Sequence, residues 1–255
     1  MNHTTKENLK THAGLLFVSL IFGTNYVFTK IIMLDVSPTF WTFYRALIAT
    51  LTLLPFVLRS PVLQELKYPR IWIAGALGIV CNQLFFTEGL KRTTPSHSSL
   101  INACIPATTL VISILAKTEK WSHRKAIGVI CAVGGVSVLI FSRTPHSVIA
   151  ATQTIGDLLT IANVLSFSIF LVISLPLARK YSALAIKGFY FLEGTFLLAL
   201  YLLAHYALAP ATETQTAWQH DFLAWRNAPL TTHAMMLFVA TFASSVTYAL
   251  NNWAL

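Results

Sequence analysis

The sequence predicts an all-helical integral membrane protein, and three observations support this fold class. Hydrophobic residues make up 55% of the 255 positions, whereas charged residues make up only 11%, far outside the usual soluble range. The apolar residues gather in runs of about 20, the length that a helix needs to cross a hydrocarbon core about 30 Å thick. These runs lack the alternation of barrel strands, so helices must satisfy the backbone groups in lipid.

Eight membrane spans are predicted between short polar connectors, at residues 13–33, 37–58, 71–90, 96–116, 126–141, 156–177, 184–205 and 234–255. The fifth run is the shortest and could extend at either end. The first run follows lysines, as a signal peptide would, but it is too long and no small-residue cleavage motif follows it. It is therefore interpreted as a helix of the mature protein.

The net charge of +9 indicates topology rather than a nucleic-acid partner. With the N-terminal residues 1–12 in the cytoplasm, twelve of the 18 lysines and arginines fall in cytoplasmic segments and four in outer loops. Lys30 and Arg45 lie within spans. This is the positive-inside bias of multi-pass proteins. The three cysteines all lie in spans without metal-ligand or disulfide spacing, so neither a metal nor a cofactor is predicted.

The chain contains a weak internal repeat. An offset of 145 residues aligns residues 37–54 with 182–199 and places Thr50 on Thr195, and an offset of 143 places Asn25 on Ser168. For the third and eighth spans the offset is 165, which places Asn82 on Thr247. A repeat unit of five helices has an odd number of crossings, so the two units must have inverted topology.

The repeat divides the chain into a first unit at 13–142, an outer linker at 143–155 and a partial second unit at 156–255. The second unit holds three helices and a long outer loop at 206–233, in which a short interfacial helix at 218–225 is one alternative. We expect a plain extracellular loop rather than a lid. By the length of the first unit, a complete second unit would end near residue 307, so a truncated product without a ninth and tenth helix is expected.

Four motifs carry a family resemblance: "FGTNYVFTK", "SPTFWTFYRALIA", "IPATTLVISILAKTEKWSHRKAIG", and "GDLL" followed by "YALNNWAL". In this order and spacing they resemble the drug/metabolite transporter (DMT) superfamily, specifically bacterial EamA-type permeases. The resemblance implies a small-solute transporter of the inner membrane, with ten helices and a central cavity lined by helices one, three, four, six, eight and nine. In this family the tenth helix is a frequent contact between copies, so a homodimer is compatible with the sequence.

Amide side chains recur near the middle of four predicted spans, at a depth set by a helical rise of 1.5 Å per residue. One such amide would be ordinary glue between helices, but four at similar depth favour a polar, mostly uncharged cavity. The tyrosines beside them could stack on a solute, although aromatic packing is commoner. The predicted substrate-binding residues are Asn25, Tyr26, Asn82, Gln83, Asn102, Asn163 and Tyr248.

Two charged residues lie deep within spans. Arg45 is about 12 Å past the start of the second span and Glu193 is similarly deep in the seventh. A central charge costs about 2.5 to 3.5 kcal/mol even on a lenient scale, so each must face protein or water. The two could pair with each other, or Glu193 could couple transport to protons, whereas a structural anchor is favoured for Arg45. Lys30 lies only about 4.5 Å from the outer end of its span, so its amine can reach water.

Pro106 is predicted to break the fourth span, because it cannot donate to the carbonyl of Asn102. Broken helices of this kind frame transporter sites, although a simple packing kink is equally compatible. The competing functions are an intramembrane enzyme, a non-transporting scaffold and an inactive fragment. Catalytic patterns such as HExxH or GxSxG are absent from the sequence, so an enzyme is not expected.

Overall fold

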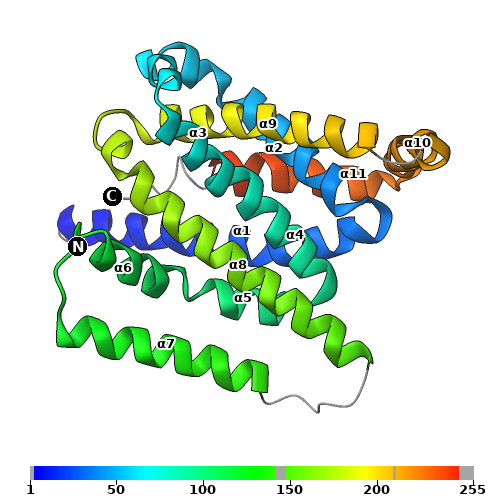
Figure 1. Ribbon diagram of the computed structural model, residues 1–255. Helices are drawn as coiled ribbons and strands as arrows, with labels where there is room; N and C mark the ends of the chain where they lie inside the picture. Colours follow the sequence, from blue (N-terminus) through cyan, green and yellow to red (C-terminus); the bar gives the residue numbers. More distant parts are fainter. Residues whose placement is uncertain (1–2, 142–147, 209–210, 247–255) are drawn as a thin grey trace.

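The computed structural model describes residues 3–141, 148–208 and 211–246, and this part of the chain is helical without strands (Figure 1). The α-helices are α1 (His3–Asp35), α2 (Pro38–Leu58), α3 (Pro69–Gly75), α4 (Asn82–Arg92), α5 (Pro95–Asn102), α6 (Ile105–Leu115), α7 (His123–Phe141), α8 (Val148–Ala178), α9 (Ala183–Leu208), α10 (Ala211–Asn227) and α11 (Leu230–Phe238). The 3₁₀-helix η1 is Pro61–Lys67, and the π-helical segments are η2 (Ala76–Cys81) and η3 (Val239–Val246).

Six helical stretches of the described chain are long and apolar enough to cross a membrane. They are Leu16–Asp35, Pro38–Leu58, Pro69–Arg92, Pro95–Leu115, Ala151–Ala178 and Ala183–Ala204. Two further apolar helices are shorter, at Lys125–Val138 and Leu230–Ser244. Each predicted span overlaps one of these eight stretches, but length and composition identify only six of them as crossings. The last predicted span, 234–255, continues past the described residues.

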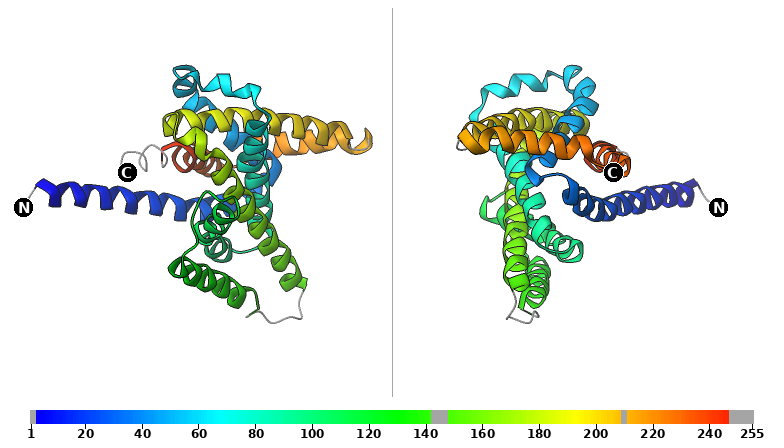
Figure 2. Two further views of the ribbon diagram at one scale, coloured as in Figure 1. Left: turned by 60° about the vertical axis from the view of Figure 1, so that its left-hand side comes forward. Right: turned by 90° about the vertical axis from the view of Figure 1, so that its right-hand side faces the viewer.

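Helix extends into three segments that the sequence predicted as connectors. α1 begins at His3, α8 begins at Val148, and α10 occupies most of the predicted outer loop. Hydropathy locates the apolar part of a helix and not its ends, which is why polar extensions escaped prediction. The N-terminal part of α1 projects away from the other helices (Figure 2).

Short polar residues and prolines set the starts of several helices. The Ser37 hydroxyl accepts a hydrogen bond from the Phe40 amide at 3.3 Å, with Pro38 in the first turn of α2. Thr94 caps α5 in the same way, accepting from the His97 amide at 3.2 Å. Such caps satisfy amides that have no partner within the helix, and proline is tolerated there because it has none to satisfy.

Two hydrophobic clusters hold the bundle together, and α2 contributes to both. One cluster joins α2, η1, α3, η2, α8 and α9 and includes the buried Leu53 and Phe189. The other joins α1, α2, α4, α11 and η3 around Trp41. Close approach of α9 to α2 depends on Gly188, where a Cβ would lie 2.6 Å from a Val57 methyl. α7 stands apart at the lower edge of Figure 1, and its apolar side chains are among the most exposed of the described residues.

A pair of glycines sets the crossing of α4 and α8. A Cβ at Gly156 would lie 2.8 Å from the Gly89 carbonyl oxygen and 2.8 Å from the Thr93 amide nitrogen. A Cβ at Gly89 would lie 2.8 Å from the Thr160 hydroxyl. Small residues at such crossings allow backbones in a membrane to pack closely, and the contact here is to backbone atoms that cannot rotate away.

An ion pair joins two connectors at the opposite end of α8. The Glu65 carboxylate in η1 accepts hydrogen bonds from Lys180 at 2.6 Å and from the Tyr181 hydroxyl at 2.7 Å. The Glu65 side chain is only 5% exposed. The hydrogen bonds from Lys180 and Tyr181 lower the pKa of Glu65 below its ordinary value of 4.5.

This ion pair predicts a stability loss in acid. Because the pKa of Glu65 is lower in the folded chain, its contribution is fully present above pH 4.5 and is lost as the pH falls through the folded value. Thermal unfolding in detergent should therefore show a smaller acid destabilisation for Glu65→Gln than for the unchanged chain. Glu119→Gln is the control, because Glu119 is exposed beside Lys125. Equal pH dependence for Glu65→Gln and the unchanged chain would contradict the assignment.

Candidate functional site

Predicted midplane residues on α4 and α8 are joined directly. The Asn163 amide nitrogen donates to the Asn82 carbonyl oxygen at 2.7 Å, and the Ser166 hydroxyl donates to the Leu77 carbonyl oxygen at 2.8 Å. The Leu77 carbonyl lies within η2 and Asn82 is the residue that follows it, and the Asn82 amide donates to the Leu77 carbonyl oxygen five residues back. A π-helical turn distorts the regular ladder, which gives polar side chains of α8 access to its carbonyls.

Two acceptor oxygens in this region have no hydrogen-bond partner among the described residues. They are the Asn163 side-chain oxygen and the Gln83 side-chain oxygen. The bond from Asn163 to Asn82 fixes which atom of the Asn163 amide is the acceptor. Buried polar atoms are nearly always satisfied, so each exception needs an explanation. Both exceptions lie near the Asn82 carbonyl of α4: Gln83 is the next residue in the chain, and Asn163 donates a hydrogen bond to that carbonyl.

The α1 residues of the predicted site have partners of their own. Asn25 is buried, and its side-chain oxygen accepts from the Thr29 hydroxyl at 3.3 Å. The Tyr26 ring packs edge-on against Phe86 of α4 with 5.4 Å between ring centroids. Tyr26 therefore takes the aromatic-packing alternative in this conformation. No hydrogen bond in the described part of the chain links Asn25 to Asn163.

The predicted break in the fourth span lies just before Pro106. α5 ends at Asn102 and α6 begins at Ile105, with a turn at Ala103 and Cys104 between them. Pro106 stands in the first turn of α6, where its missing amide leaves no bond unmade. The Asn102 side chain donates to the Ser98 carbonyl of its own helix at 2.9 Å. Tyr248, the remaining predicted residue, lies outside the described residues.

The two deep charges face different helices. Arg45 is buried and donates through Nε to the Ser244 hydroxyl of η3 at 2.9 Å. Glu193 is 2% exposed, and neither of its carboxyl oxygens has a hydrogen-bond partner in the described chain. Its carboxyl group lies against Gly75, where a Cβ would come within 2.3 Å of the carboxyl carbon. The alternative that Arg45 and Glu193 pair with each other is therefore wrong for this conformation.

Contacts between the two halves follow the offsets found in the sequence. Thr50 and Thr195, aligned by the offset of 145, share a hydrogen bond of 2.8 Å between their hydroxyls. The offset of 165 carries residues 76–81 of η2 onto 241–246, which lie within η3. Each π-helical segment packs against the helix that carries a deep charge, η3 against α2 and η2 against α9.

Thr93 joins three helices at the end of α4, a role that sequence reasoning missed. Its hydroxyl donates to the fully buried Asp157 carboxylate of α8 at 2.6 Å, and its carbonyl accepts from Lys30 of α1 at 2.8 Å. His97 lies 3.5 Å from the other Asp157 oxygen. The sequence signal was an aspartate at the start of an apolar span, which needs a partner when buried.

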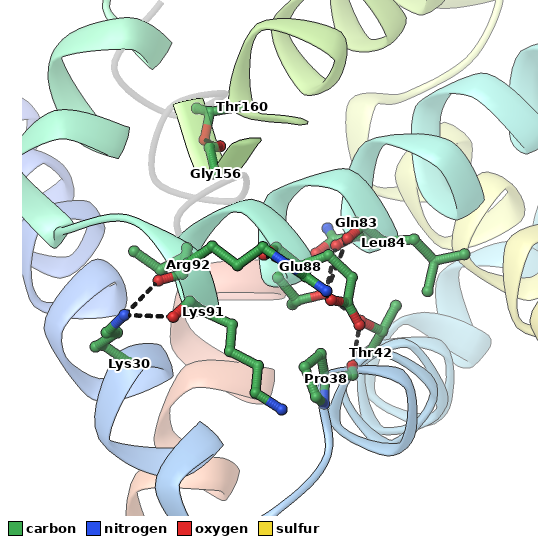
Figure 3. A network of polar contacts seen from close by, with 12 residues as sticks. Lys30, Pro38, Thr42, Gln83, Leu84, Glu88, Lys91, Arg92, Gly156 and Thr160 are labelled. Carbon is green, nitrogen blue, oxygen red and sulfur yellow. Dashed lines mark hydrogen bonds and ion pairs between the residues drawn. The ribbon is translucent and has the colours of Figure 1, made fainter. Parts of the chain in front are cut away.

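Lys30 caps the C-terminus of α4, as Figure 3 shows. Its ammonium donates to the carbonyl oxygens of Leu90, Lys91 and Thr93 at 2.7 to 2.8 Å. The last carbonyls of a helix lack intrahelical partners and carry the negative end of its dipole. The sequence predicted that the Lys30 amine would reach water at the outer end of its span. In the structure the amine instead binds the last carbonyls of the neighbouring helix α4. Figure 3 also shows Thr42 of α2, whose hydroxyl lies 2.9 Å from that of Thr87.

Lys30→Met should lower the free energy of unfolding by about 2 kcal/mol. The variant loses three charge-assisted hydrogen bonds, and the carbonyl oxygens that accepted them cannot all find other donors. Denaturant unfolding in detergent measures this change. Lys91→Met is the matched control, since Lys91 contributes only its carbonyl to the cap and its side chain is exposed. Equal losses for the two variants would show that the cap adds nothing.

Two pockets lie at other levels of the bundle. The first, about 330 Å³, is lined by Lys30, Arg92, Thr93, Thr94, Pro95, Thr152 and Gln153. The second, about 250 Å³, is mostly apolar and lies between the α5–α6 break, α7 and α8. Neither pocket is lined by the predicted midplane residues that the structure describes.

Comparison with known proteins identifies relatives in plants and archaea. A WAT1-related protein of Arabidopsis thaliana is 29% identical over 184 residues, covering 63% of this chain and 47% of that protein. Protein WALLS ARE THIN 1 of the same plant is 25% identical over 216 residues, covering 69% and 55%. An uncharacterized transporter of Archaeoglobus fulgidus is 26% identical over 206 residues, covering 78% and 70%. The chain spans about half the length of these two plant relatives.

A family model matches residues 9–141, just over half of the chain, from the first part of α1 to the end of α7. This match covers three of the four motifs that carry the sequence resemblance, and the relatives agree with it. The chain is a multi-pass membrane protein and belongs to the EamA-like transporter family, within the drug/metabolite transporter superfamily.

Proposed function

We propose that this chain is a secondary transporter that moves a small polar or amphipathic metabolite, such as an amino-acid-like solute, by alternating access around a central polar cavity. The single observation that carries the proposal is the pair of unpartnered acceptors on Gln83 and Asn163. Both are buried near the middle of apolar helices, where an unmade hydrogen bond is costly. A solute that donates hydrogen bonds would satisfy them during its passage.

The repeat supports a motion of two inverted halves. A two-fold axis in the membrane plane would place equivalent residues side by side wherever they lie close to it. Thr50 and Thr195 are equivalent residues of this kind, because their hydroxyls share a hydrogen bond. The two π-helical segments also occupy equivalent positions in the two halves. In this proposal the halves rock about the contact of α2 with α9, and η2 and η3 absorb part of the change in helix shape.

The distribution of basic residues supports a bacterial inner (plasma) membrane orientation with the N-terminus in the cytoplasm. The Glu65 ion pair then lies on the cytoplasmic side, and the cap formed by Lys30 lies on the outer side. The midplane amides lie between them. Since the Lys30 cap ties α1 to the end of α4, we propose that it holds the outer side closed in this conformation.

The transporter is distinguished from an intramembrane enzyme and from a scaffold by flux. The purified 255-residue chain in liposomes should move at least one solute among amino acids, nucleosides and organic cations, at a rate above empty liposomes. An Asn25→Leu variant that folds should move it more slowly. Chemical conversion of a solute without movement would favour the enzyme, and neither flux nor conversion would favour the scaffold or an inactive fragment. Either result would contradict the proposal.

A further inference from the structure

We propose that Glu193 is a proton-binding site: its carboxyl group holds a proton while α9 packs against α3, as in this structure, and releases it when the two helices separate. The protonated state follows from the packing alone. The release rests on the proposed alternating motion. The proton comes from water as H⁺ bound to one carboxylate oxygen and returns to water when the O–H bond breaks, so no other reactant is needed.

The packing around Glu193 buries its side chain and offers its carboxyl group no hydrogen-bond partner among the described residues. The side chain is 2% exposed, and both carboxyl oxygens lack a hydrogen-bond partner among the described residues. Gly75 lies directly against the carboxyl group, and the next residue, Gly194, lies so close to Ile79 that a Cβ would come within 2.4 Å of it. The carboxyl group therefore lies against the backbone of α3, and the next residue of α9 lies against η2.

The ionisable groups on neighbouring elements do not compensate a negative charge at Glu193. Arg45 donates to Ser244, and Lys187 holds its ammonium over the rings of Phe191 and Phe167 at 4.9 and 5.9 Å. None of the ionisable groups on the packed elements makes a described hydrogen bond or ion pair with Glu193. They are Tyr44 and Arg45 on α2, Glu65 and Lys67 on η1, Arg70 on α3, Cys81 on η2, Asp157 on α8, Lys187, Tyr190, Tyr201 and Tyr206 on α9, and His220, Asp221 and Arg226 on α10.

An ionised carboxylate without partners in this surrounding would be strongly disfavoured, and buried acids of this kind take up a proton instead. The hydroxyl of Tyr190, one turn earlier on α9, also lacks a hydrogen-bond partner in the part of the chain that the structure describes. The unpartnered carboxyl group makes the contact of α9 with α3 and η2 less favourable than a contact in which every polar group is satisfied. Separation of α9 from η2 would admit water, and the carboxyl group would then ionise.

Infrared spectroscopy of the purified chain tests the proton directly. A protonated carboxyl group has a carbonyl stretching band that a carboxylate lacks. We expect such a band near neutral pH in the unchanged chain, its loss in Glu193→Gln, and its retention in Glu65→Gln, whose carboxylate is held by Lys180 and Tyr181. If the Glu193→Gln variant fails to fold, Glu193→Asp takes its place, and the carbonyl stretching band should shift in frequency in that variant. A Glu193→Gln spectrum identical to that of the unchanged chain would overturn the proposal.

The second half of the proposal is tested by the pH dependence of flux. Flux by the unchanged chain should vary with pH, and flux by folded Glu193→Gln should not. Equal pH dependence in both would overturn the release step while leaving the infrared result to decide the protonated state. A chain that moves no solute but shows the Glu193 band would contradict the transporter and retain the proton site, so the two failures are distinguishable.

Discussion

Gly156→Val should lower the free energy of unfolding by about 3 kcal/mol, one of the largest effects expected of any single change. The new Cβ would press on the Gly89 carbonyl and the Thr93 amide, both 2.8 Å away, and backbone atoms cannot turn aside as a side chain can. Relief requires α8 to move away from α4. That movement would stretch the bond from Thr93 to Asp157 as well.

The matched control for this prediction is Gly134→Val in α7. A Cβ at Gly134 meets no atom within 4 Å, so the same substitution there adds bulk without a collision. Denaturant unfolding in one detergent gives both values. A Gly156→Val loss no larger than that of Gly134→Val would mean that the close crossing of α4 and α8 is absent in the protein.

Asn163→Leu should reduce solute flux by about ten-fold or more, because the loss of one or two hydrogen bonds to the passing solute, at about 1 to 1.5 kcal/mol each, corresponds to a factor of roughly ten. The substitution removes the unpartnered oxygen and also the donor to the Asn82 carbonyl. Flux in liposomes should be measured beside unfolding, so that a transport defect is separated from a folding defect.

Two companion variants sharpen this result. Ser137→Ala removes a hydroxyl that bonds only its own helix, at Val133, and should leave flux unchanged. Asn163→Asp keeps an acceptor oxygen and should retain more flux than Asn163→Leu when a hydrogen-bond-donating solute is offered. Full flux in a folded Asn163→Leu variant would exclude Asn163 from the path.

The sequence predicted the helical class, the approximate spans and the family, because long apolar runs and basic connectors carry that information locally. Thr50 and Thr195 are an instructive case: a weak alignment of two runs predicted their equivalence, and the structure adds that they touch. The polar ends of helices were not predictable in this way. α10 contains the short interfacial helix that was one alternative at 218–225 and extends beyond it at both ends, where polar residues give no hydropathy signal.

Partners that come from distant helices could not be predicted from the sequence. Lys30 was expected to reach water, yet it caps α4, because depth along one helix says nothing about which neighbour is near. Arg45 and Glu193 have opposite charges at similar depth, which made a pair plausible, but they face η3 and α3 respectively. The rotation of each helix about its axis decides such contacts, and it is set by packing across the whole bundle.

Access of water to the midplane distinguishes a solute path through Asn25 and Asn163 from a permanently closed core. Cysteine is placed at Asn25 and, separately, at Asn163 in a background without Cys81, Cys104 and Cys131, and a membrane-impermeant thiol reagent is applied from either side of the membrane. We predict that the reagent labels both positions from both sides, and that the transported solute slows the labelling. Leu51→Cys on the exposed apolar face of α2 is the control. Labelling at Asn25 and Asn163 no faster than at Leu51 would contradict a solute path through these residues.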